Sequence, residues 1–176
     1  LMLAWVSYAF AFSSLTYHFF PLLLERGLDS AGAVLVLTVI GPAQVAGRIL
    51  IRAFAAEAPV RSVGSVVVVV FPLAVVGFGF APPEVLVIAG VAAFYGAANG
   101  MITIVRGMAV PEMVTRDGYG AVNGSLVAPM NIMTALAPLG AALLWQASGG
   151  YGAVLAAIFI GSLMLCAGFW FAAARS

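Results

Sequence analysis

The sequence predicts an all-helical polytopic membrane protein with six transmembrane helices in a single domain, residues 1–176. The composition is the first observation, because 64% of the residues are hydrophobic and only 7% are charged, whereas about a quarter of the residues in a soluble domain are charged. The second is that the charged residues gather in short clusters between long apolar runs. The third observation is that each run is close to the roughly 20 residues that a helix needs to cross a bilayer.

The first three predicted spans are residues 1–24, 31–54 and 63–80. The charged segments ERGLDS and AAEAPVRS end the first two, and the turn APPE ends the third. The third span contains the β-branched run VVVVVFP, which would favour a strand in water. In lipid it is compatible with a helix, because every backbone group must be paired within its own segment.

The last three predicted spans are residues 85–106, 119–147 and 153–174. The segments GMAVPEMVTRDG and SGGYG separate them. No connection in the chain is long enough to hold a soluble domain, so we expect the six helices to form one unit.

The arginines predict how the chain is oriented. Six of the seven lie in or beside the second and fourth connections or at the chain end: Arg48, Arg52, Arg61, Arg106, Arg116 and Arg175. Only Arg26 lies on the other side. Because arginine and lysine accumulate in short cytoplasmic loops, both chain ends are expected in the cytoplasm.

The sequence contains no pattern typical of an enzyme. It has a single histidine, no lysine for a phosphate-binding loop, and neither an H-E-x-x-H nor a G-x-S-x-G motif. We therefore expect no catalytic residues, no metal site and no cofactor. The net charge of +1 also argues against nucleic acid as a partner.

Uncharged polar residues within the apolar runs are the candidates for a functional site. Such groups avoid lipid and face either neighbouring helices or a water-filled cavity. The residues predicted to line a substrate cavity are Tyr17, His18, Gln44, Tyr95, Asn99, Asn131 and Thr134.

Structural roles remain open for several of these residues. The His18 ring could bind substrate or relay a proton, or it could satisfy a carbonyl that Pro21 leaves free. Asn131 and Thr134 could line a cavity together with Tyr95, or they could form interhelical hydrogen bonds. No Asp or Glu lies deep in a predicted span, so His18 is the only local candidate for proton coupling near neutral pH.

Two nearly identical hexapeptides, YGAANG at 95–100 and YGAVNG at 119–124, place two glycines four residues apart. Gly96 with Gly100, and Gly120 with Gly124, would each form a smooth stripe that another helix can approach closely. We expect both pairs to pack against neighbouring helices, with substrate contact by Asn99 as the alternative.

Three arginines near predicted helix ends, Arg48, Arg52 and Arg106, are expected on the cytoplasmic side. Their long side chains can extend to the lipid headgroups. Helix orientation and contacts of a cytoplasmic gate are the predicted roles, and anion binding is the alternative.

Four segments resemble the carboxyl-terminal six-helix half of the major facilitator superfamily, over nearly the whole chain: HFFPLLLERGLDSAGA, IGPAQVAGRILI, YGAANGMITIVRGMAVPEM and GYGAVNGSLVAPMNIMTALAPLGAALLW. The resemblance implies half of a twelve-helix secondary transporter, such as an efflux protein, in the bacterial inner membrane. It implies a central cavity for a small-molecule substrate and alternating access. An amino-terminal six-helix half, or a second copy of this chain, would then be the partner within the bilayer.

A three-plus-three inverted repeat is expected for such a half, although the sequence repeat itself is small. It pairs VIGPAQVAGRILI with ALAPLGAALLW, which share small residues and a proline. A six-helix accessory or assembly subunit of a larger membrane complex, with no transport activity, is the alternative function.

Overall fold

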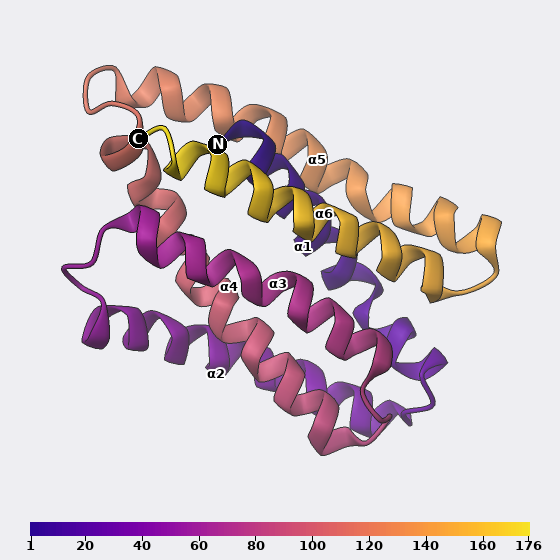
Figure 1. The fold of residues 1–176 in the computed structure, drawn as a ribbon. Coiled ribbons are helices and arrows are strands. Elements are labelled where there is room, and N and C mark those ends of the chain that lie inside the picture. Colours follow the sequence, from indigo (N-terminus) through magenta and orange to yellow (C-terminus); the bar gives the residue numbers. More distant parts are fainter.

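The computed structural model describes residues 1–176 as six α-helices joined by short connections (Figure 1). They are α1 (Met2–Glu25), α2 (Ser30–Phe54), α3 (Val60–Phe80), α4 (Val85–Met113), α5 (Tyr119–Ser148) and α6 (Tyr151–Ala173). The helices from α2 to α6 are long and apolar enough to cross a membrane. The fold is therefore all-helical, as expected, and five apolar helices of this length indicate an integral membrane protein.

Helix α1 is the exception, because its polar residues keep it out of this group of five. It is nevertheless 24 residues long, and its buried residues include Ser7, Ser13 and Ser14. It packs against both α5 and α6 and also touches α2. Enclosure by other helices explains the three serines, since side chains that face protein need not be soluble in lipid. That α1 also spans the membrane stays a prediction.

Helix α4 extends seven residues beyond Arg106, where the sequence predicted that a connection would begin. The added segment includes Pro111. It is held by packing, because Ala109 and Val110 are buried, and by Glu112, whose Oε2 accepts a hydrogen bond from the Val60 backbone N–H at 3.2 Å. Contacts with the start of α3 therefore outweigh the local preference of proline to end a helix.

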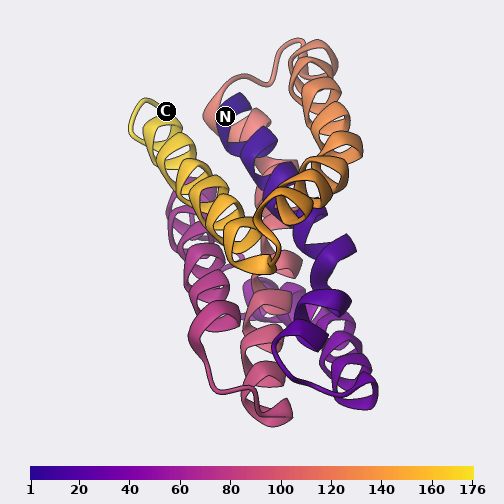
Figure 2. The same ribbon diagram turned by 90° about the vertical axis from the view of Figure 1, so that its right-hand side faces the viewer.

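The pairing of neighbouring helices is largely preserved when α1, α2 and α3 are exchanged with α4, α5 and α6. Helix α2 packs on α4 as α5 packs on α1, and α3 packs on α4 as α6 packs on α1. Helices α3 and α6 contact each other, which the exchange preserves. Two pairs differ in extent: the α2–α4 contact is larger than its counterpart between α1 and α5, and the α5–α6 contact has no counterpart of similar size between α2 and α3. In Figures 1 and 2, α1 lies with α5 and α6, and α4 lies with α2 and α3, so the two exchanged groups are interleaved.

The same exchange relates two helix caps formed by carboxylates. Glu25 at the end of α1 accepts a hydrogen bond from the Tyr151 backbone N–H at the start of α6, at 2.7 Å. Glu112 near the end of α4 caps the start of α3 in the same way. Carboxylates are favourable at helix N-termini, where backbone N–H groups lack partners. These acids, assigned by the sequence to connections and helix ends, thus join the helices.

Both chain ends and the α2–α3 and α4–α5 connections lie at one end of the bundle (Figure 1). The other three connections lie at the opposite end. Arg26 is at that opposite end, where its guanidinium donates to the carbonyl oxygens of Phe78 and Ala81 at the end of α3. The arginine-rich connections therefore share one end of the molecule.

Candidate functional site

The crossing of α2 and α4 is the closest helix contact relevant to the site. A Cβ atom on Gly96 would lie 2.8 Å from the Ile40 carbonyl oxygen, and one on Gly100 would overlap the backbone of Gln44. From the other side, a Cβ atom on Gly47 would overlap the backbone of Ala97. The glycines of YGAANG thus lie against α2, as the sequence suggested for this pair.

The second glycine pair is placed differently from the expectation. Both Gly120 and Gly124 are exposed, and a Cβ atom on either would have no neighbour within 4 Å. The sequence prediction that they pack against another helix is not met in this chain, because α5 turns that side outward. Similar hexapeptides therefore have different surroundings.

The close α2–α4 crossing places two polar side chains of α4 at the centre of the bundle, where Tyr95 is 4% and Asn99 is 1% exposed. The ring of Tyr95 packs edge to face with Phe71 and Phe78, at centroid distances of 5.8 Å. Tyr8 of α1 also packs edge to face with Phe71, at a centroid distance of 5.6 Å. Aromatic packing therefore fixes the position of both tyrosines.

A pocket of about 250 Å³ lies between α1, α2 and α4. Four of its ten lining residues are polar but uncharged: Thr16, Gln44, Tyr95 and Asn99. The others are Phe12, Leu15, Phe19, Leu37, Ile40 and Gly41. Three predicted cavity residues, Gln44, Tyr95 and Asn99, are thus brought together, and we call this site the central pocket.

Two polar groups at the central pocket lack hydrogen-bond partners. The Tyr8 hydroxyl donates to Asn99 Oδ1 at 2.7 Å. The Nδ2 group of Asn99 and the hydroxyl of Tyr95 have no partner in hydrogen-bonding geometry, and the two groups lie close to each other. Burying an amide or a hydroxyl without a partner costs on the order of 1–3 kcal/mol, so such groups are uncommon inside proteins. The central pocket therefore contains polar groups that are available to a ligand.

The sequence did not predict a role for Tyr8. A signal for it exists, because the spacing between Tyr8 and Glu25 equals the spacing between Tyr95 and Glu112. These pairs occupy equivalent places in α1 and α4, the helices related by the exchange described above. Aligning the repeat on these two pairs would have paired Tyr8 with Tyr95.

His18 lies outside the central pocket and links three helices. Its Nε2 lies 3.0 Å from the carbonyl oxygen of Pro138 in α5, and its Nδ1 lies 3.0 Å from the hydroxyl of Tyr151 in α6. A carbonyl only accepts hydrogen bonds, so Nε2 carries the proton, and in the neutral ring Nδ1 accepts from Tyr151. Both ring nitrogens are used, which favours the structural role over the cavity role.

Two serines of α1 bind the same part of α5. Pro138 has no N–H, so the carbonyl of Thr134 one turn earlier lacks its usual donor. The Ser13 hydroxyl donates to that carbonyl at 2.7 Å, and the Ser14 hydroxyl donates to the Ala137 carbonyl at 3.3 Å. The proline that interrupts α5 is therefore compensated by hydrogen bonds from α1.

The remaining cavity candidates, Tyr17, Asn131 and Thr134, are exposed and do not line the central pocket. The exposed fraction of Tyr17 is 70%. The Thr134 hydroxyl donates to the Met130 carbonyl of its own helix at 2.9 Å. The structure thus does not bring these three side chains together with Tyr95 and Asn99.

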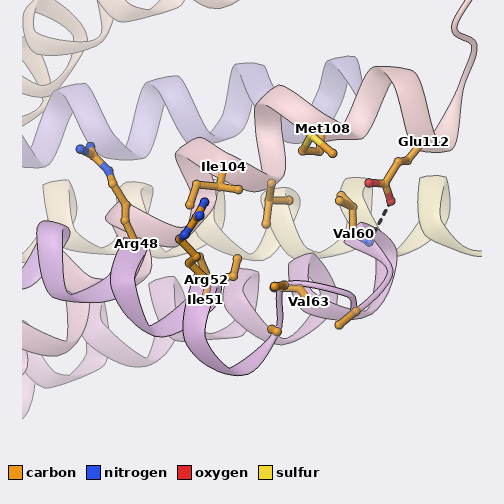
Figure 3. A pocket seen from close by; sticks show the side chains of 12 residues that line it. Arg48, Ile51, Arg52, Val60, Val63, Ile104, Met108 and Glu112 are labelled. Carbon is orange, nitrogen blue, oxygen red and sulfur yellow. Dashed lines mark hydrogen bonds between the residues drawn. The ribbon is translucent and has the colours of Figure 1, made fainter.

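A second pocket, of about 390 Å³, lies between α2, α3 and α4 at the arginine-rich end. Arg48 and Arg52 of α2 line it together with Glu112 of α4 (Figure 3). Arg48 and Glu112 lie towards opposite ends, and Glu112 points to the Val60 backbone N–H. Arg106 does not line this pocket, and its Nη1 contacts the Met130 sulfur at 3.4 Å instead. The three arginines thus do not form one cluster.

Comparison of the chain with protein-family models, curated proteins and solved structures finds no match.

Proposed function

We propose that this chain is one half of a secondary active transporter that carries a small solute by alternating access. The observation that supports this most strongly is the exchange relation between α1–α3 and α4–α6, because three-plus-three repeats of opposite orientation are typical of transporter halves. Substrate sites in such proteins lie at the interface between repeats. The central pocket has this location, since α1 and α2 come from one group and α4 from the other.

The residues of the central pocket have distinct roles in this proposal. Asn99 and Tyr95 contact the solute, and Gln44 lies at the side of the pocket formed by α2. The hydrogen bond from Tyr8 to Asn99 joins α1 to α4, the two equivalent helices. The remaining wall of the transport path comes from an amino-terminal six-helix half or from a second copy, as the family resemblance implies. Helices α2 and α5 have the fewest buried residues and provide the surface for this contact.

Orientation is part of the proposal. The arginine-rich end, with both chain ends, faces the cytoplasm, and the membrane is the bacterial inner membrane. Single cysteines in a Cys166→Ala background test this orientation. At Pro83 and Ser148 an impermeant thiol reagent added outside intact cells should label them, whereas at Glu57 and Asp117 it should not. The reverse labelling pattern would contradict the orientation.

Transport is tested with the protein expressed from its complete reading frame and reconstituted into liposomes. Solute uptake should saturate with concentration and should fall in the Tyr95→Phe variant. The 176 residues alone, as a monomer, should not support uptake, because they form only one side of the path. Uptake by such a monomer would contradict the half-transporter assignment. A short stand-alone reading frame beside genes for a membrane complex would favour the accessory-subunit alternative.

A further inference from the structure

We infer that the central pocket binds an uncharged, largely apolar molecule that presents a carbonyl or similar acceptor oxygen to Asn99 and Tyr95. This inference rests on the proposed function, since it names the solute class for the same site. It is carried by the two unpartnered polar groups at the pocket and by the chemistry of its walls.

The walls exclude charged ligands. None of the ten residues that line the central pocket is an acid, an arginine or a histidine. An ionised carboxylate or ammonium group placed there would lose its hydration without gaining an opposite charge, which costs several kcal/mol. The arginines of α2 line the second pocket instead (Figure 3). A neutral ligand avoids this penalty.

The unpartnered groups select an acceptor. Asn99 Oδ1 is occupied by the Tyr8 hydroxyl, which orients the amide so that its NH₂ group is the free end. An amide NH₂ only donates hydrogen bonds, and a tyrosine hydroxyl can also donate. Both are on α4 one helical turn apart, so they lie on the same face. One acceptor oxygen, or two neighbouring ones, would satisfy both groups.

The rest of the pocket selects an apolar body of modest size. Phe12 and Phe19 contribute aromatic surface, and Leu15, Leu37 and Ile40 contribute aliphatic surface. The volume of about 250 Å³ lies below the range of roughly 300–1,000 Å³ that is usual for drug-sized ligands. A small aromatic or cyclic amide, ketone or lactone has the required combination of size, neutrality and acceptor oxygen.

Four probes of nearly equal size test the inference by calorimetry on the complete protein in nanodiscs. Benzamide is neutral with a carbonyl acceptor, benzoate is an anion, benzylamine is a cation, and ethylbenzene has no acceptor. Benzamide should bind most tightly. Equal or tighter binding of benzoate, benzylamine or ethylbenzene would overturn the inference, and so would the absence of binding by all four.

The Tyr95→Phe variant tests the hydrogen bond itself. It removes only the hydroxyl and keeps the ring that packs against Phe71 and Phe78. Benzamide affinity should fall about three- to tenfold, while the melting temperature stays unchanged or rises, because an unpartnered buried group is lost. The matched control Tyr8→Phe removes a partnered hydroxyl and should lower the melting temperature. Equal destabilisation by both variants would show that Tyr95 is paired within the protein.

The Gln44→Met variant and a transport assay distinguish failure of this inference from failure of the proposed function. Gln44→Met changes the polar group contributed by α2 and should weaken benzamide binding less than Tyr95→Phe does. If benzamide binds as described but no solute is transported, the ligand class stands and the transporter assignment fails. If a solute is transported and benzamide does not compete with it, transport stands and this inference is wrong.

Discussion

The crossing of α2 with α4 and the crossing of α1 with α5 are equivalent in the bundle, yet different chemistry holds each of them. At the first crossing, Gly96 and Gly100 bring backbone against backbone. At the second, Ser13, Ser14 and His18 of α1 donate hydrogen bonds to carbonyl oxygens of α5.

Ser13 and Gly100 illustrate the contrast, because each faces a backbone carbonyl of the helix it crosses. Ser13 donates a hydrogen bond to the Thr134 carbonyl of α5, whereas Gly100 lies directly against the Gln44 carbonyl of α2. Ser13, Ser14 and His18 of α1 are therefore occupied by their hydrogen bonds to α5. Glycines hold α4 against α2, so Tyr95 and Asn99 of α4 are not needed to hold the two helices together. The difference indicates which polar side chains are free for a ligand: Tyr95 and Asn99 of α4, and not the three α1 residues that bind α5.

The largest effect is expected from adding a side chain at the glycine crossing. Gly100→Ala places a Cβ atom into the backbone of Gln44, which cannot move without shifting α2. Overpacking of this kind costs about 1–3 kcal/mol and more where backbone must shift. Thermal unfolding in detergent should therefore show a large decrease in melting temperature, with loss of monodisperse protein.

Gly124→Ala is the matched control, since a Cβ atom there has open space and alanine favours a helix over glycine. It should leave the melting temperature unchanged or raise it. Equal destabilisation at Gly100 and Gly124 would mean that the two hexapeptides are equivalent after all, and the contrast between the crossings would be lost.

A smaller effect is expected from removing the ring that links α1 to α5 and α6. His18→Ala deletes both hydrogen bonds of the imidazole, to Pro138 and to Tyr151, and leaves the Tyr151 hydroxyl without this partner. A loss of roughly 1–3 kcal/mol follows. Tyr17→Ala, at an exposed neighbour, should stay within about 0.5 kcal/mol.

Unfolding titrations on both variants measure the difference. If His18→Ala leaves stability unchanged but abolishes solute uptake, the histidine serves transport, and the polar crossing depends on the serines alone.

The sequence predicted the helices well, because apolar runs of bilayer length and clustered charges leave few alternatives. It failed at the end of α4, where the segment GMAVPEMVTRDG was expected to form a connection after Arg106, but Glu112 and the buried Val110 hold the helix on α3. It also failed at Gly120 and Gly124. A glycine stripe makes close approach of another helix possible, but the hexapeptide alone does not indicate on which side that helix lies.

The candidate site was predicted only in part. Gln44, Tyr95 and Asn99 meet in the central pocket, because polar groups in apolar helices avoid lipid. The same rule could not distinguish these pocket residues from His18, whose hydrogen-bond partners are a backbone carbonyl and a tyrosine far away in the sequence. Pairing with backbone depends on how helices cross, which composition does not specify. Tyr8 could have been predicted only by aligning α1 with α4 as repeats, and that alignment becomes clear only from the helix contacts in the structure.

The smallest effect is expected from Ser13, and it gives the most specific test of the crossing of α1 with α5. The test measures the energetic coupling between Ser13 and Pro138. Ser13→Ala should cost about 1 kcal/mol, since the Thr134 carbonyl loses its donor. In a Pro138→Ala background, the new backbone N–H at position 138 can pair with that carbonyl within α5. Ser13→Ala should then cost clearly less, and the difference is the coupling energy of a double-mutant cycle. Additive costs would mean that Ser13 does not compensate the proline and that its hydrogen bond to α5 acts independently of Pro138.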